Sequence, residues 1–314
     1  MGLSEVSELC YKITESYLKL NHETSIIIET QNAIRLTRHY LLDDIFTRWS
    51  PINGEISFSY NGGKDCQVLL LLYLSCLWEF FIVNAKRSQF EAKYQKFPME
   101  QLPTVFIDQD ETFTTLENFI LETSKRYNLS LYESKKEVGR NQSMADAFRD
   151  FLKIYPETKA IAIGVRSTDP YGELLKPIQK TDSNWPNFTR LQPLLHWKLA
   201  NIWSFLLFSN EPICALYVHG FTSIGGIKNT IPNPYLAVQN KENKENKAPK
   251  LYFEWEIKNS FNNGESPTNK RIGTSVSYLD KADEKISIGL GQTKFFPGWY
   301  LIDDALERAG RLKK

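Results

Sequence analysis

The chain has 314 residues, of which 42% are hydrophobic, and its formal net charge at pH 7 is +1. A chain of this length and composition buries a full hydrophobic core, in one large domain or in one domain with an appendage. The balanced charge excludes the broad basic surface of a nucleic-acid-binding protein, so any phosphate binding has to be local.

The cysteines and the apolar stretches predict a reduced protein of the cytoplasm. None of the four cysteines forms a CxxC pair or has a histidine at zinc-ligand spacing, which argues against a structural zinc and against an oxidising compartment. Charged residues run through the N-terminal region, which lacks the apolar core of a signal peptide. The longest apolar stretch, near residues 68–82, contains Glu79 and is too short to span a bilayer.

Taken in chain order, the hydrophobic pattern predicts helices that alternate with strands. Helices are expected at 4–20 and 25–48, and the second must end before Pro51, because the residue before a proline avoids helical backbone angles. The elements that follow are strands at 55–60, 103–108, 129–133 and 160–165, and helices at 65–81, 112–127 and 143–152, the last with Ser143 as its N-cap. This alternation is typical of an α/β fold with a mostly parallel central sheet and helices on both faces. In such sheets, ligands bind at the carboxyl ends of the strands.

The rest of the chain is less regular. Residues 166–190 predict a long loop, which we expect to be functional because loops of this length are uncommon inside compact domains. The further candidates are a strand at 190–195, an amphipathic helix at 198–209, a disordered charged insert at 240–247 and a strand at 251–257. The last residues, 303–314, predict a helix with Asp303 and Asp304 at its start and basic residues at its end, as the helix dipole favours.

The segment SFSYNGGKDC, residues 57–66, joins a predicted strand to a predicted helix. Gly62 and Gly63 allow the backbone to approach a ligand with no Cβ in between. The amides at the start of the helix from Asp65 suit an anion, although the spacing is not that of a Walker A loop. By itself the segment is equally consistent with a phosphate-binding loop and with a plain strand–turn–helix connection.

Two other strand ends carry polar residues that have a structural explanation as well as a functional one. Asp108 and Asp110 either serve a ligand or cap the next helix. Arg166 suits a phosphate and Asp169 suits Mg²⁺, but the two could equally form a surface ion pair that fixes a loop. Three aromatic residues are expected to be core or structural: His196, Trp197 and Trp203.

Taken together, these segments resemble the PAPS-reductase-like adenine-nucleotide α-hydrolase superfamily. The matching blocks occur in order between about residues 53 and 231: SFSYNGGKDC at 57–66, VFIDQDETF at 105–113, IGVR at 163–166, and the block from Pro193 to Gly226. Within this superfamily, the segments GVRSTDPYGE, KTDSNWPNFTRLQPLLHW and PGWYLIDDALERAGRLKK are similar to the fungal FAD synthetases, which are FMN adenylyltransferases. Asn61 and Cys66 depart from the wider SGGxDS pattern, but the fungal FAD synthetases share NGGKDC.

The resemblance implies an organisation, a reaction and a set of partners. It implies an N-terminal helical segment at 1–52 packed on the core, a nucleotidyl-transfer core at 53–231, and a C-terminal extension at 232–314 with a disordered insert near 238–250 and a terminal helix. The implied enzyme transfers the adenylyl group of ATP to FMN, with Mg²⁺ as cofactor, and releases FAD and pyrophosphate. We expect a cytoplasmic monomer with small-molecule substrates and with no nucleic-acid or membrane partner.

The resemblance also assigns roles to individual residues. The residues implied in catalysis are Asn61, Asp65, Arg308 and Arg311. Those implied in binding ATP or pyrophosphate are Ser59, Tyr60, Gly62, Gly63, Lys64, Arg166 and Ile107, the last through its backbone at the adenine. Those implied in flavin binding are Gly164, Asp169, Asp182, Trp185, Phe188 and Arg190. Mg²⁺ is assigned to Asp65 and Asp169.

Two rival functions are weighed against this one. A PAPS reductase or a sulfate-activating adenylyltransferase shares the fold, but the reductases carry a nucleophilic cysteine in a C-terminal tail, and this chain has no cysteine after Cys214. A non-catalytic flavin carrier would bind FMN without turning over ATP. Turnover of ATP in the presence of FMN separates the enzyme from the carrier.

Overall fold

The structure of the chain is a computed structural model that describes residues 1–21, 24–87, 96–107, 111–134, 143–238, 253, 279–283 and 294–312. Several of the predictions lie outside these residues. They are the charged insert at 240–247, all but one residue of the candidate strand at 251–257, and the acidic residues Asp108 and Asp110.

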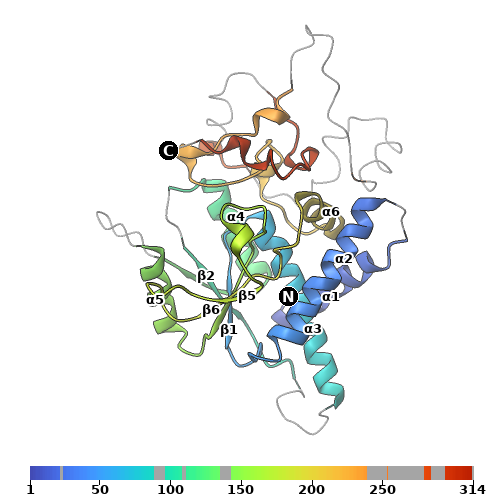
Figure 1. The fold of residues 1–314 in the computed structure, drawn as a ribbon, viewed down its shortest axis with the longest axis vertical. Coiled ribbons are helices and arrows are strands. Elements are labelled where there is room, and N and C mark those ends of the chain that lie inside the picture. Colours follow the sequence, from blue (N-terminus) through green and yellow to red (C-terminus); the bar gives the residue numbers. More distant parts are fainter. Residues whose placement is uncertain are drawn as a thin grey trace.

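A six-stranded sheet with the order β3-β2-β1-β4-β6-β5 forms the centre of the molecule (Figure 1). Its strands are β1 (Ile56–Ser59), β2 (Leu102–Phe106), β3 (Leu129–Glu133), β4 (Ala160–Ile163), β5 (Ile178–Lys180) and β6 (Thr189–Leu191). Neighbouring strands are parallel except for the antiparallel pair of β5 and β6. The mostly parallel sheet of an α/β fold is thus confirmed.

The described helices cover both faces of this sheet. They are α1 (Leu3–Leu18), α2 (Ser25–His39), α3 (Lys64–Arg87), α4 (Thr114–Arg126), α5 (Met144–Ile154) and α6 (Leu199–Ser209). The larger hydrophobic core joins α1, α2, α3, α4 and α6 to one face, and a smaller cluster of Val105, Phe148, Phe151, Ile161 and Phe188 joins α5 to the other.

The strand order explains this division. The chain steps outward from β1 to β2 and β3, and then returns across β1 to form β4 on its other side. Because crossovers between parallel strands are right-handed, reversing the direction of travel moves the connecting helix α5 to the opposite face. The reversal point, between the carboxyl ends of β1 and β4, is where ligands bind in open α/β sheets.

Helix α3 is longer than the sequence predicted, with 24 residues from Lys64 to Arg87. By length and composition it could cross a membrane, since its mean hydropathy reaches 2.0 over an 18-residue window. However, 67% of that window is buried inside the protein, which is the pattern of a helix in a hydrophobic core. The N-cap of α5 is confirmed, because Ser143 Oγ accepts a hydrogen bond of 3.2 Å from the amide of Asp146.

Three predicted elements differ in the structure. The second helix is α-helical only to His39 and continues as a π-helix over Tyr40–Ile45. The expected loop at 166–190 contains β5 and the start of β6, so it adds a hairpin to the edge of the sheet. The expected C-terminal helix is wrong: the segment forms a single 3₁₀ turn at Glu307–Gly310.

Tertiary pairing explains the missing C-terminal helix. The amide of Ile231 donates to the carbonyl of Gly310 at 2.9 Å, and Thr230 forms an antiparallel bridge with Arg311. A Cβ at Gly310 would overlap the carbonyl oxygen of Ile231, so the backbones of the two segments are in close contact. These contacts use backbone groups that a helix would need for itself.

Candidate active site

The connection between β1 and α3 is a tight turn in which the two glycines have different roles. Gly62 has a backbone φ of +69°, and a Cβ there would lie 2.8 Å from Leu116 and 2.9 Å from Ile120, so it is required by the turn and by packing on α4. Gly63 faces a more open space, in which the nearest atom to an added Cβ is Oδ1 of Asn61 at 2.9 Å. Of the two glycines, only Gly63 therefore faces a side chain that can turn away rather than the packed surface of α4.

The first amides of α3 are already hydrogen-bonded. The amide of Gly63 donates to Oδ1 of Asn61 at 2.9 Å, and the amide of Lys64 donates to the hydroxyl of Tyr217 at 2.9 Å. Tyr217 is buried and packs edge-on against Trp203. Our sequence analysis did not identify Tyr217 as a site residue, because nothing local links it to a turn 153 residues earlier.

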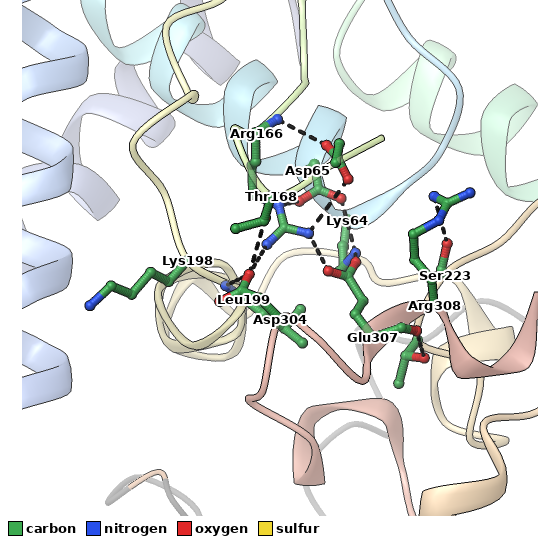
Figure 2. Close-up of polar contacts among 12 residues, drawn as sticks. Lys64, Asp65, Arg166, Thr168, Lys198, Leu199, Ser223, Asp304, Glu307 and Arg308 are labelled. Atoms are coloured by element: carbon green, nitrogen blue, oxygen red, sulfur yellow. Dashed lines mark hydrogen bonds and ion pairs between the residues drawn. The ribbon is translucent and has the colours of Figure 1, made fainter. Parts of the chain in front are cut away.

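A buried cluster of opposite charges lies beside this turn (Figure 2). Arg166, which has no exposed surface, places Nε 2.7 Å from Asp65 Oδ1 and Nη1 2.6 Å from Asp304 Oδ1. Its Nη2 pairs with Glu307 Oε2, and the Nζ of Lys64 pairs with Glu307 Oε1. The carboxylate of Glu307 therefore bridges both buried cations.

Further contacts complete this cluster. Lys64 Nζ also lies 3.0 Å from Asp65 Oδ2, and the Arg166 amide donates to Asp169 Oδ2 at 2.9 Å. Asp304 Oδ1 accepts from the amide of Leu199 at 2.9 Å, which fixes the C-terminal segment to the start of α6. Two cations here face four carboxylates, so the cluster carries a net negative formal charge.

The pKa values of these groups reflect that imbalance. Burial alone would raise the pKa of Asp65, but the neighbouring Lys64 and Arg166 lower it below its ordinary value. Burial and the charge of Asp65 raise the pKa of Asp169. Despite burial, Asp65 and Glu307 raise the pKa of Lys64. The cluster thus holds Asp65 and Lys64 in their charged forms, while Asp169 experiences excess negative charge.

Two of these carboxylates suit a divalent cation. In the part of the chain that the structure describes, no three His, Cys, Asp or Glu side chains come together as a metal site. Asp65 and Asp169 lie together, and Oδ1 of Asp65 is buried and forms an ion pair with Arg166 Nε that lacks hydrogen-bond geometry, so it makes no hydrogen bond among the described residues. Mg²⁺ is commonly held by one or two carboxylates together with water and substrate phosphates. The two carboxylates fit such an ion, and phosphates of the substrate would complete its coordination.

The C-terminal arginines lie next to this cluster. Arg308 follows Glu307 directly, is exposed, and donates from Nη1 to Ser223 Oγ at 3.5 Å (Figure 2). The guanidinium of Arg311 lies over Gly225, where a Cβ would overlap it. The segment that carries both arginines therefore packs on residues 222–226, close to Lys64. The sequence predicted this proximity only through the resemblance.

The predicted flavin residues lie on and beside the β5–β6 hairpin. Asp182 is exposed and its Oδ2 lies 3.3 Å from Nη2 of Arg190, whose Nε is buried without a hydrogen bond among the described residues. Trp185 is partly buried and Phe188 is buried, and both rings pack on Phe148 of α5. Phe188 is thus part of the small core beneath the hairpin.

Three other predicted site residues lie at the carboxyl ends of the central strands. Gly164 follows β4, and a Cβ there would lie 2.8 Å from the backbone of Cys66, so glycine permits close contact between the end of β4 and the start of α3. Ser59 ends β1, and the buried Tyr60 donates its hydroxyl to Gln67 at 2.6 Å. Ile107 directly follows β2.

The residues expected to be structural are structural. Trp197 and Trp203 are buried, and His196 Nε2 lies 2.9 Å from the carbonyl oxygen of Ala33. All four cysteines are buried, and none of them is in a disulfide. Burial raises the pKa of Cys66 to about 12, so its thiol is protonated at neutral pH and is unsuited to nucleophilic catalysis.

Comparisons with known proteins agree with this geometry. Residues 55–232 match the phosphoadenosine phosphosulfate reductase domain family. The chain is 64% identical over 315 aligned residues to the flavin adenine dinucleotide synthase of Saccharomyces cerevisiae, and the match covers 100% of both chains.

Solved structures show the same similarity. Two crystal structures are of Candida glabrata FMN adenylyltransferase, one with FMN and the ATP analogue AMPCPP and one with FAD and inorganic pyrophosphate. Each matches this chain with a TM-score of 0.84 at 55% sequence identity, covering 99% of this chain and 100% of the other.

Proposed function

Because this chain belongs to the FAD synthase family, within the larger family of phosphoadenosine phosphosulfate reductase domains, we propose that the carboxyl edge of its sheet joins FMN to the adenylyl group of ATP. The chain is a nucleotidyltransferase that uses FMN and ATP and forms FAD and pyrophosphate. We propose the roles of individual residues in this reaction as follows.

The reaction needs no covalent intermediate with the protein. An oxygen of the FMN phosphate forms a bond to the α-phosphorus of ATP. The bond from that phosphorus to the oxygen that bridges to the β-phosphorus breaks, and pyrophosphate leaves with the electron pair. The phosphate monoester of FMN is already anionic, so no general base is required. The main obstacle is repulsion between two anions, and the protein contributes positioning and charge stabilisation.

The turn before α3 suits the β- and γ-phosphates of ATP. Gly63 leaves space in front of the turn, and the side chain of Lys64 lies beside it. An ammonium group has three N–H donors, and two of those of Lys64 face Asp65 and Glu307. The third remains for a phosphate oxygen. Asn61, whose side chain holds the turn through the Gly63 amide, would keep the cradle in shape.

Mg²⁺ is the proposed cofactor at Asp65 and Asp169. When bound, it would neutralise charge on the ATP phosphates. The two carboxylates would then repel one another less, because the excess negative charge around Asp169 would have a counter-ion.

Arg308 and Arg311 are the proposed source of positive charge at the transferring phosphoryl group. Arg308 is exposed, and it follows Glu307, which contacts Lys64. An arginine that stabilises the transition state of phosphoryl transfer is worth on the order of a thousandfold in rate. Their location supports this role, whereas full burial of Arg166 among carboxylates favours a different role for that residue.

The β5–β6 hairpin is the proposed flavin site. Asp182 is exposed and offers a hydrogen-bond acceptor to a ring N–H of the flavin. Arg190 Nε is a buried donor that makes no hydrogen bond among the described residues, which supports a polar ligand nearby. Trp185 offers a partly exposed aromatic ring for stacking. Phe188, being buried, would support the hairpin from below.

The observation that carries this proposal is the meeting of Lys64 with the segment of Arg308, at the start of α3 beside the carboxyl end of β4. The test is pyrophosphate release from ATP and Mg²⁺, measured with FMN present and with FMN omitted. We expect release only with FMN, matched by an equal amount of FAD. Release without FMN, or FMN binding without release, would contradict the proposal.

We further propose that the protein acts as a monomer in the cytoplasm, without a nucleic-acid or membrane partner. The net charge of +1 supports the absence of a nucleic-acid partner, and four cysteines outside any disulfide support a reducing compartment. Sedimentation of the purified chain tests the monomer, and a concentration-dependent dimer would contradict it.

A further inference from the structure

The C-terminal segment forms little regular structure of its own, so its position depends on contacts with the rest of the chain. It has backbone contacts on one side: Thr222 donates to the carbonyl of Glu307 at 2.5 Å, and Asn233 donates to that of Leu306 at 2.9 Å. On the other side, its carboxylates Asp304 and Glu307 reach inward to the buried cations (Figure 2).

The guanidinium of Arg166 is buried and faces carboxylates of the protein. Its side chain is 0% exposed, and Nε, Nη1 and Nη2 each contact a carboxylate oxygen, of Asp65, Asp304 and Glu307 respectively. A guanidinium carries N–H donors on these three nitrogens alone. These contacts support a role for Arg166 in holding the C-terminal segment, beside the phosphate-binding role implied by the resemblance.

We propose that Asp304 and Glu307 are positioning residues, which lock the C-terminal segment onto Arg166 and Lys64 and so hold Arg308 and Arg311 at the phosphate-binding turn. This proposal rests on the proposed function of the two arginines. Arg166 acts as the central residue of the lock, because it joins Asp65 of α3 to both carboxylates of the segment.

An alternative is that Glu307 occupies Lys64 only until a phosphate displaces it. The contacts favour the lock for two reasons. First, Glu307 is held by its backbone carbonyl as well as by its side chain. Second, the residue is 4% exposed, and its carboxylate binds two cations at once. Withdrawing it would break two buried ion pairs at once, one with Arg166 and one with Lys64, which is unfavourable.

The consequence for catalysis is a matter of geometry. Arg308 directly follows Glu307, so a shift of the backbone at Glu307 moves the arginine with it. A displacement of about 1 Å in a group that positions a reaction costs on the order of a hundredfold in rate. The lock would thus affect turnover without any contact between Glu307 and FMN.

The test is Glu307→Gln, which keeps the size of the side chain. Its –NH₂ group replaces one carboxylate oxygen, so a donor faces either Lys64 or Arg166 in place of an acceptor. We expect kcat/KM for ATP to fall on the order of a hundredfold, with FMN binding unchanged. Asp303→Asn is the matched control: it removes the same charge from an exposed residue of the same segment, and Oδ1 can still accept from the amide of Ala305. We expect that control to keep wild-type rates.

Two further measurements show whether Glu307 acts through Arg308. In a double-mutant cycle, Glu307→Gln should cost far less in the Arg308→Ala background than in the wild type, because the positioned group is already missing. Hydrogen–deuterium exchange of the peptide containing residues 303–312 should become faster in Glu307→Gln and not in Asp303→Asn.

The outcomes separate this proposal from the proposed function. Unchanged exchange in Glu307→Gln, or additive losses in the cycle, would overturn the lock, as would a lower KM for ATP with an undiminished rate. Faster exchange with an undiminished rate would instead overturn the role of Arg308 in catalysis. If Glu307→Gln does not fold, Asp304→Asn replaces it, because its side-chain oxygen still accepts from the amide of Leu199 while its charge on Arg166 is lost.

Discussion

Replacing Gly63 by valine should abolish turnover of ATP and leave the protein folded. The backbone of Gly63 is not in the left-handed region, since the described glycines with positive φ are Gly54, Gly62 and Gly220. An added Cβ meets Oδ1 of Asn61 at 2.9 Å, and Asn61 is exposed and able to turn away. Losing the hydrogen bond from the Gly63 amide to that oxygen costs about 1 kcal/mol of folding stability.

The effect on the reaction is much larger than the effect on stability. A branched side chain at residue 63 fills the space through which a phosphate approaches the turn, and we expect kcat/KM for ATP to fall by on the order of a thousandfold or more. The assay is pyrophosphate release with saturating FMN, together with thermal unfolding of the same preparation.

Gly62→Ala is the matched comparison, since it alters the neighbouring glycine of the same turn. A left-handed conformation costs an alanine about 1–2 kcal/mol, and overlap with Leu116 and Ile120 adds about 1–3 kcal/mol. We therefore expect this variant to lose stability first. Near-normal kinetics in a folded Gly63→Val protein would refute the phosphate cradle, and a fully stable Gly62→Ala protein would refute the packing argument.

The remaining predictions concern three other residues. Arg308→Ala should lower the rate with FMN and ATP on the order of a thousandfold while changing stability by less than about 0.5 kcal/mol, and a wild-type rate would remove this residue from catalysis. Asp182→Ala should raise the Kd for FMN about tenfold and leave that for ATP unchanged, as equilibrium binding would show; the reverse pattern would mean that the two subsites are wrongly divided. Cys66→Ser should keep most of the activity, because the buried thiol is protonated at neutral pH, and a loss of several orders of magnitude in a folded protein would indicate a thiolate mechanism.

The central part of the fold was predictable because its elements have strong periodic patterns. The strands β1 to β4 and the helices α3 to α5 follow from alternating buried runs and helical faces. The strand β5 was missed, and the candidate strand at 190–195 overlaps β6 only at residues 190 and 191, because each of these strands has only 3 residues, too few to show an alternation. β6 pairs with the edge that β4 supplies, β5 pairs with β6 in turn, and no local pattern encodes this pairing.

The C-terminal segment was predicted wrongly for a related reason. Its acidic start and basic end are what a helix dipole favours, yet Asp304 and Glu307 are directed at Arg166, which lies 138 and 141 residues earlier in the chain. Tertiary ion pairs of this separation leave no trace in a short window of sequence. The turn of Gly62 and Gly63 was recognised as a candidate, whereas its partner Tyr217 was not.

The long helix α3 has a consequence for the timing of turnover. Every residue from Cys66 to Leu77 is buried, so the turn that precedes this helix is fixed to the hydrophobic core and moves only when the core does. We therefore expect entry of FMN and exit of FAD to depend on segments other than this turn. The connection between β4 and β5, for example, carries Tyr171 and Leu174, whose side chains are 91% and 85% exposed. Changes that stiffen the core of this protein should therefore raise its thermal stability without slowing the exchange of substrate and product.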